Sequence, residues 1–331
     1  MSDHAISDIS PPHLLVIGGI TAEMREAVSS DFILHDYFDS DDKPGLIRQH
    51  SAQIEGILTN GHDGVPDLLI SKLPHLKIIS CYGVGYDAID VKAASERNII
   101  VTHTPNVLNE EVAITAILLL FSVARQLPLA MRWIKDGHWA SQGHAPLSTS
   151  PHGMKVGLVG YGRIGQTIAD RLRMFGCHIS YHSRHEKSEA PDSYVADLTE
   201  MASACDALIV ITPGGPSTHH LITADVLNAL GPDGILVNVA RGSVVDEEAL
   251  VDSLVHGRLG GAGLDVFADE PHVPKALLDM EQVICTPHIG SATVETRAAM
   301  GRLTTDNLKL FFAEGRVISS VPETAHLLKD N

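Results

Sequence analysis

Short apolar runs alternate with amphipathic stretches through the first hundred residues of the chain. Apolar runs bounded by glycine, proline or polar residues are typical of buried strands, and apolar residues at helical spacing predict helices between them. One such helix begins at Thr21, whose hydroxyl could cap it, and another covers 91–97. The predicted strands are residues 13–17, 32–38, 54–59, 76–81 and 99–102.

A second alternating series follows a long apolar helix and a loose connection. The helix is predicted for residues 106–127, with Pro105 just before it and Pro128 at its end. Glycine, proline and polar residues then predict an irregular connection over 137–152, and helical spacing returns at 293–312. The six predicted strands of this series are residues 154–159, 177–181, 207–211, 235–239, 263–266 and 283–285.

Alternating strands and helices favour parallel sheets that are covered on both faces. A chain of 331 residues also exceeds the usual size of one hydrophobic core. We therefore predict an α/β fold of two Rossmann-like, doubly wound domains. The second domain, residues 103–290, would be inserted in the first, which combines residues 1–102 and 291–331.

Charge and composition exclude some partners. The chain has 24 Lys and Arg against 41 Asp and Glu, a net charge of −17, so neither nucleic acid nor a membrane surface is expected to bind. The longest apolar run, 112–124, is too short to span a bilayer, and the segment up to Pro12 lacks the order of a signal peptide. We predict a cytoplasmic protein with four reduced thiols, Cys81, Cys177, Cys205 and Cys285.

The loop Gly160-Tyr161-Gly162-Arg163-Ile164-Gly165 follows a predicted strand and opens a predicted helix. In such a loop the first glycine permits a tight turn, the second lets the backbone approach a pyrophosphate, and the third allows helix and strand to pack closely. The helix N-terminus adds free N–H groups and a favourable dipole. The sequence therefore predicts a dinucleotide site, which makes 103–290 the nucleotide-binding domain and leaves a flavodoxin-like substrate domain.

The residues after strand 177–181 indicate which dinucleotide binds. An NAD site usually has Asp or Glu there, which accepts hydrogen bonds from the ribose 2′-hydroxyl. This chain has His182, Ser183 and Arg184 instead, with no carboxylate before Glu186. Arg184 could form a charge-assisted fork with a 2′-phosphate, and Ser183 could donate to it. NADP is the expected cofactor, and NAD is possible but disfavoured.

Six segments in order carry a resemblance to a known family. From about Cys81 to Pro322 the chain resembles the D-isomer-specific 2-hydroxyacid dehydrogenases, and within them the NADP-dependent glyoxylate and hydroxypyruvate reductases. Each segment is modestly specific alone, whereas all six in order are very specific. The segments are GVGYDAID at 83–90, TPNVLNEEVA at 104–113, the glycine loop, VNVARGSVVD at 237–246, LDVFADEP at 264–271 and TPHIGS at 286–291.

The resemblance implies a catalytic arginine, acid and histidine, which the motifs place at Arg241, Glu270 and His288. Reduction of a 2-keto acid also requires these residue types. Arg241 offers a planar fork for the carboxylate and could polarise the keto oxygen. His288 could deliver a proton near neutral pH, and Glu270 could orient its imidazole and favour the protonated form.

The resemblance implies further contacts. Backbone amides of Val84 and Gly85 would share the substrate carboxylate with Arg241, and Ser291 would line the same site. Related reductases form dimers through the region of Trp133 and Trp139. We therefore expect a homodimer, in which Trp139 either reaches a substrate pocket or simply packs. Cofactor contacts implied outside the 2′-phosphate region are Gly160, Tyr161, Gly162, Arg163, Ile164, Gly165, Thr212, Pro213, Val239, Arg241, Asp265, His288 and Gly290.

The leading hypothesis is an enzyme that reduces glyoxylate or hydroxypyruvate to the D-hydroxy acid with NADPH. A reductase of 2-ketogluconate or an aryl pyruvate is the alternative within the class. A non-catalytic, dinucleotide-sensing protein like the corepressors of this fold is the alternative outside it. No metal is expected, because the pairs His182/His185 and His219/His220 do not form a complete ligand set.

Overall fold

The computed structural model describes residues 10–328. The chain divides into two compact units. Unit 1 combines the residues up to Leu108 with those from Val294 onward, and unit 2 is Asn109–Thr293. The boundaries predicted from the sequence lie a few residues from these breaks, and the roles assigned to the two domains stay predictions. The segment up to residue 9, for which the sequence indicates no signal peptide, lies outside the described residues.

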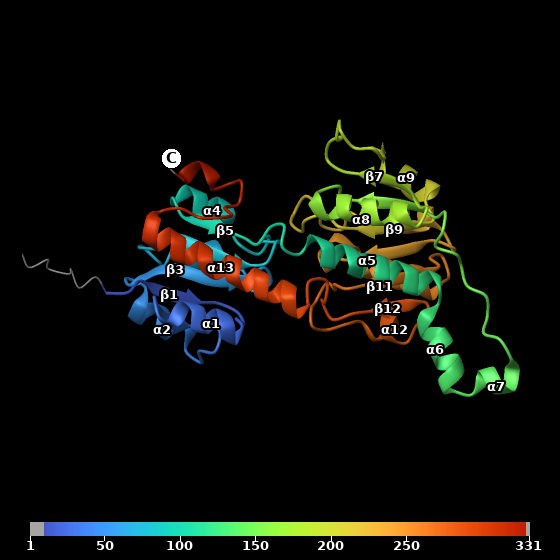
Figure 1. Cartoon of the computed structure of the whole chain (residues 1–331), viewed down its shortest axis with the longest axis horizontal. Helices are drawn as coiled ribbons and strands as arrows, with labels where there is room; N and C mark the ends of the chain where they lie inside the picture. The colour runs from blue at the N-terminus through green and yellow to red at the C-terminus, as the bar shows by residue number, and fades with distance from the viewer. Residues whose placement is uncertain (1–9, 329–331) are drawn as a thin grey trace, which may run out of the picture. The chain divides into compact units, whose positions relative to one another are not determined.

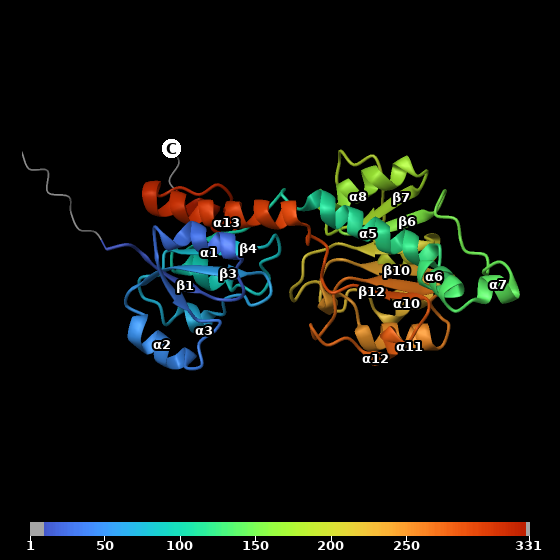
Figure 2. The same cartoon turned by 60° about the horizontal axis from the view of Figure 1, so that its bottom comes forward.

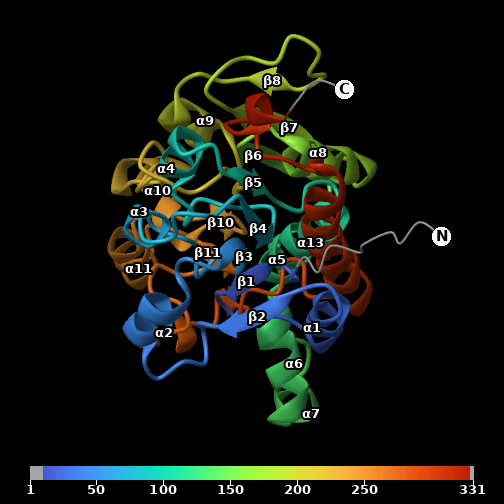
Figure 3. The ribbon, with the colours of Figure 1, turned by 90° about the vertical axis from the view of Figure 1, so that its left-hand side faces the viewer.

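Unit 1 is a parallel sheet with helices on both faces. Its strands are β1 (His13–Val16), β2 (Ile33–Asp36), β3 (Ile54–Asn60), β4 (Ile78–Tyr82) and β5 (Ile100–Thr102), and its helices are α1 (Ala22–Ser29), α2 (Lys43–His50), α3 (Asp67–Ile70), α4 (Val91–Glu96) and α13 (Val294–Glu314). The strand order is β2-β1-β3-β4-β5, the flavodoxin-like order, and Figure 3 shows these strands following one another across the sheet. Helices α1 and α13 cover one face, and α2 and α3 cover the other (Figure 2).

Unit 2 is a larger parallel sheet with the same layering. Its strands are β6 (Lys155–Val159), β7 (His178–His182), β8 (Ser193–Tyr194), β9 (Ala207–Val210), β10 (Ile235–Asn238), β11 (Gly261–Leu264) and β12 (Val283–Cys285). Its helices are α5 (Asn109–Ala124), α6 (Leu127–Lys135), α7 (His138–Gln142), α8 (Arg163–Met174), α9 (Leu198–Ala204), α10 (Ala224–Leu230), α11 (Glu247–Val255) and α12 (Lys275–Leu278). The strand order is β12-β11-β10-β9-β6-β7-β8, which reverses direction between β6 and β9 as in a Rossmann sheet. The predicted α/β class is confirmed.

The six strands predicted for unit 2 are present, together with one that was not predicted. Strand β8 has two residues and pairs only with β7 at the edge of the sheet, so it leaves no readable period in the sequence.

Several helices begin at a residue whose side chain accepts a hydrogen bond from the first helical turn. The predicted cap Thr21 accepts a hydrogen bond from Met24 N at 3.2 Å, and Asp246 caps α11 by accepting from Ala249 N at 3.1 Å.

The helix predicted for 106–127 is wrong at its end. Helix α5 ends at Ala124, Gln126 adopts a left-handed conformation with φ 48°, and α6 begins at Leu127. Pro128 therefore lies in the first turn of α6, where its missing N–H costs nothing, and does not terminate a helix. The connection predicted to be irregular also contains α7. Figure 1 shows α6 and α7 projecting from the rest of unit 2.

No single helix within residues 10–328 is both long and apolar enough to cross a membrane. Helices α5 and α6 reach that length and composition only as a pair, which is bent by 59°. All four cysteines are free thiols.

Candidate active site

The glycine loop joins β6 to α8, and each glycine meets a different steric condition. Gly160 has φ +108°, and a Cβ there would lie 2.7 Å from Ile211 O. A Cβ on Gly165 would lie 2.5 Å from Gly160 O, so helix and loop pack at backbone distance. A Cβ on Gly162 would meet nothing within 4 Å, which leaves this side of the loop open.

The open side of the loop fits a pyrophosphate. Helix α8 begins at Arg163 immediately after Gly162, so the first N–H groups of the helix, from Arg163 and Ile164 onward, lie beside the open backbone. The Tyr161 side chain points elsewhere. It is buried, stacks on Tyr181 with ring centroids 4.1 Å apart, and donates a hydrogen bond to Asp192. Burial, and then that carboxylate, raise the pKa of the Tyr161 hydroxyl. A cofactor contact of Tyr161 would therefore come from its backbone.

The end of β7 lies next to the glycine loop, because Gly160 N donates to His182 O at 2.9 Å. The His182 ring Nδ1 lies 3.1 Å from Val195 O, and the Ser183 hydroxyl donates to His185 O at 2.6 Å. Arg184 is exposed and has no ion-pair or hydrogen-bond partner within residues 10–328. Of the three residues predicted to hold a 2′-phosphate, Arg184 has its charged group available, whereas the Ser183 hydroxyl already donates within its own loop.

The predicted acid and histidine meet in unit 2. Nδ1 of His288 lies 2.8 Å from Oε2 of Glu270. The other carboxylate oxygen of Glu270 accepts a hydrogen bond from Phe267 N at 3.1 Å, which fixes the carboxylate in the turn after β11. The His288 side chain is 45% exposed and that of Glu270 is 21% exposed. Because Glu270 occupies Nδ1, Nε2 is the nitrogen left for proton transfer.

Asp265 organises the loop that carries His288. This buried carboxylate accepts hydrogen bonds from Thr286 Oγ1 at 2.7 Å, Ile289 N at 2.8 Å and Gly290 N at 2.8 Å. His288 itself has φ 52°, a strained conformation for a residue with a side chain, and its N–H donates to Asp265 O at 3.0 Å. The sequence predicted only a cofactor contact for Asp265 and missed this anchoring. A carboxylate directly after a buried strand was the available signal.

Arg241 follows β10 and precedes a short 3₁₀ turn, Gly242–Val244. Its backbone carbonyl accepts a hydrogen bond from Asn238 Nδ2 at 2.9 Å, and Nη1 donates to Ala240 O at 2.8 Å. Strands β9 to β12 are parallel neighbours, so their carboxyl ends meet at one edge of the sheet. That edge carries several predicted residues: Thr212 and Pro213 after β9, Val239 and Arg241 after β10, Asp265 and Glu270 after β11, and His288, Gly290 and Ser291 after β12.

Val84 and Gly85 lie in unit 1, in the loop after β4. The Val84 carbonyl is 3.0 Å from Nδ1 of His103, and the Gly85 carbonyl is 3.7 Å from Sγ of Cys81. Neither N–H of the pair donates a hydrogen bond within the described residues, which leaves both amides available to an anion. Trp139 lies on α7 of unit 2 and is 57% exposed.

The histidine pair that follows β9 lies in a loop of unit 2. His219 and His220 stack on each other with centroids 4.0 Å apart. Across residues 10–328, no group of three or more His, Cys, Asp or Glu is arranged to hold a metal ion.

Comparisons with known proteins find similar sequences and structures. Residues 117–290 match the family model of the D-isomer specific 2-hydroxyacid dehydrogenase NAD binding domain. Glyoxylate/hydroxypyruvate reductase A from Arabidopsis thaliana is 39% identical over 93% of this chain and 98% of its own length. The 2-ketogluconate reductase of Gluconobacter oxydans is 39% identical over 94% of this chain and 99% of its own length.

A solved structure is also similar to this chain. The NADPH-dependent glyoxylate/hydroxypyruvate reductase of Sinorhizobium meliloti, in complex with NADP and malonate, is 46% identical, with a TM-score of 0.89. The match covers 95% of this chain and 98% of that one.

Proposed function

Because the chain belongs to the D-isomer-specific 2-hydroxyacid dehydrogenase family, we propose that it reduces a small 2-keto acid to the D-2-hydroxy acid with NADPH. Glyoxylate and hydroxypyruvate are the proposed substrates. The observation that carries the proposal is the 2.8 Å contact of His288 with Glu270, at the sheet edge that also carries Arg241.

Each of the three side chains has a distinct task in the proposed reaction. A bound NADPH would supply the hydride to the carbonyl carbon. Arg241 binds the substrate carboxylate through its planar fork and stabilises negative charge that develops on the keto oxygen. His288 gives the proton on Nε2 to that oxygen, and Glu270 accepts the Nδ1 proton in a hydrogen bond, which orients the ring and stabilises the imidazolium. The parts of Val84, Gly85, Ser291 and Trp139 in substrate binding stay predictions.

A panel of keto acids tests the proposal. The purified protein should oxidise NADPH rapidly when glyoxylate or hydroxypyruvate is present. With 2-ketogluconate or 4-hydroxyphenylpyruvate, NADPH oxidation should be slower. His288→Ala should lower kcat by about 10²–10⁴-fold, and the variant should still bind NADPH. Tight NADPH binding without turnover of any acid would favour the dinucleotide-sensing alternative. A kcat unchanged in His288→Ala would remove this residue from the mechanism.

We propose NADP rather than NAD because Arg184 presents a free guanidinium beside the glycine loop and no carboxylate lies at the end of β7. The kcat/KM ratio of NADPH over NADH should lie well above one. Arg184→Ala should lower that ratio, whereas Lys187→Ala, which removes an exposed cation from the same loop, should leave it nearly unchanged. A wild-type ratio near or below one would refute the preference.

We further propose a homodimer and a cytoplasmic location. Leu127, Met131 and Ile134 are 46%, 64% and 63% exposed and recur at i, i+4 and i+7, so they form one apolar stripe along α6. A second copy of the chain is the proposed partner for this stripe, because an isologous interface buries the same apolar patch on both copies. The four free thiols support the reducing compartment.

A further inference from the structure

The turn that carries Glu270 is tied to a second glutamate. Phe267 N donates to Glu270 Oε1 at 3.1 Å, and the next amide, Ala268 N, donates to Glu247 Oε2 at 3.0 Å. Two successive N–H groups of the turn are therefore bound by two different carboxylates. One carboxylate contacts the His288 ring, and the other belongs to a helix on a different segment of the chain.

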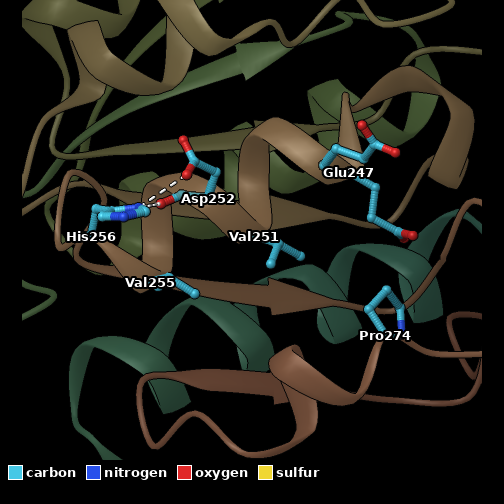
Figure 4. Close-up of a pocket in the computed structure, with 7 residues that line it drawn as sticks. Glu247, Val251, Asp252, Val255, His256 and Pro274 are labelled. Atoms are coloured by element: carbon cyan, nitrogen blue, oxygen red, sulfur yellow. Dashed lines mark hydrogen bonds and ion pairs between the residues drawn. The ribbon is translucent and has the colours of Figure 1, made fainter.

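Glu247 is itself well placed to act as an anchor. It is the first residue of α11, directly after the helix cap Asp246, so its backbone is fixed by the start of a regular helix. Its side chain is half-buried, whereas that of the next residue, Glu248, is exposed. Both line a surface groove of about 370 Å³ between α11 and Pro274, and Figure 4 shows Glu247 at the opposite end of this groove from His256.

The N–H group of Ala268 does not need Glu247 as a hydrogen-bond acceptor. Ala268 is exposed, so water could satisfy its N–H if the carboxylate were removed. The bond therefore contributes little to the free energy of unfolding, and its main effect is on the orientation of the turn. The charge of Glu247 also reaches the end of β12, three residues before His288: burial, and secondarily Glu247, raise the pKa of the Cys285 thiol to about 11.

We propose that Glu247 is a positioning residue, which holds the 267–270 turn so that the carboxylate of Glu270 stays on Nδ1 of His288. The inference rests on the proposed roles of Glu270 and His288. A turn released from α11 lets Glu270 move away from the ring, and a shift of about 1 Å in such a contact costs up to about a hundredfold in rate.

Three variants separate positioning from charge. Glu247→Ala removes the acceptor, Glu247→Gln keeps an oxygen acceptor without the charge, and Glu248→Ala removes a neighbouring charge from the same helix turn. We expect Glu247→Ala to lower kcat about tenfold or more, with the KM for NADPH unchanged. Glu247→Gln and Glu248→Ala should stay within about twofold of the wild type, and all should unfold at nearly the same temperature.

A second readout does not depend on turnover. In histidine-labelled protein, the signal of the proton between His288 Nδ1 and Glu270, assigned with His288→Asn, should broaden or disappear in Glu247→Ala and stay as in the wild type in the other two variants. The same signal and the same kcat in Glu247→Ala and Glu248→Ala would overturn the inference. If the wild type turns over no keto acid, the proposed function fails, and this signal still decides whether Glu247 positions the pair.

Discussion

At the scale of single residues, the site depends on backbone contacts as much as on side chains. Gly242 follows Arg241, and a Cβ on it would overlap the carbonyl group of Phe267. The segment that carries the arginine and the turn that carries Glu270 therefore touch through main-chain atoms. Any side chain at 242 must push the two segments apart.

We expect Gly242→Ala to lower the free energy of unfolding of unit 2 by about 1–3 kcal/mol, because the methyl group overpacks this contact. It should also lower kcat, since Arg241 and Glu270 move relative to each other. Urea denaturation and steady-state kinetics measure the two effects. Gly19→Ala is the matched control, because a Cβ there meets nothing within 4 Å. Equal unfolding midpoints and kcat values for both variants would contradict the argument.

The sequence could indicate which residues lie at the sheet edge, because motifs and strand ends are both local. It could not indicate how they are held. The three donors that bind Asp265 come from a loop more than twenty residues away, and that loop closes only with His288 in a left-handed conformation. Nor could the glycine motif show that the Tyr161 side chain points into the core, because this follows from the stack on Tyr181.

At the scale of elements, strands were predicted more accurately than helix ends. The buried strands are compact apolar runs, and their observed ends fall within about two residues of the prediction. The break between α5 and α6 was missed because apolar residues resume directly after Arg125 and Gln126, so the period alone favours one helix. A proline in the first turn of a helix and a proline just after a helix leave the same local signal.

Three histidines from neighbouring elements of unit 1 lie in contact with one another. Their contact predicts that the free energy of unfolding depends on pH. The His35 ring on β2 stacks on that of His13 on β1 and is tilted against that of His50 on α2, with centroids 5.0 and 4.2 Å apart. Burial, and then the neighbouring His50 and His13, lower the pKa of His35 from 6.5 to about 4, although Asp36 opposes the shift. Between pH 6.5 and 4, His35 therefore binds a proton in the unfolded chain but not in the folded one. Its contribution to the free energy of unfolding is fully present above pH 6.5 and is lost as the pH falls towards 4.

The pH effect can be isolated by substitution. Urea unfolding midpoints of the wild type should fall from pH 7.5 to pH 5, and His35→Gln should show a smaller fall, because it removes the group that must take up a proton. Carboxylates contribute equally to the pH dependence of both proteins. The test is therefore the difference between the two slopes of unfolding midpoint against pH. Parallel slopes would show that the stack does not govern stability in this range.

At the scale of the whole molecule, the order of strands decides where the chemistry lies. Residues from 212 to 291 reach one edge of the unit 2 sheet because β9 to β12 are parallel and adjacent. The alternating pattern predicted parallel sheets, but the pairing of each strand depends on crossover connections that local sequence does not encode. The glycine loop fixed the position of β6 as the central strand, since this motif lies at the point where a Rossmann sheet reverses its order.

The apolar stripe on α6 leads to a prediction about whether two copies of the chain associate. Helix α6 has no buried residue and projects from unit 2, so Leu127, Met131 and Ile134 face solvent in one chain. Burial of such side chains between two copies is worth about 1.5–3 kcal/mol each, and a charge in the buried stripe costs more than it can recover. Met131→Glu should therefore convert a dimer into a species of 35.5 kDa in sedimentation velocity. Arg132→Gln changes the net charge by the same amount off the stripe and loses only an exposed ion pair with Glu281, so it should remain dimeric. A monomeric wild type, or equal dissociation of the two variants, would exclude α6 as the interface.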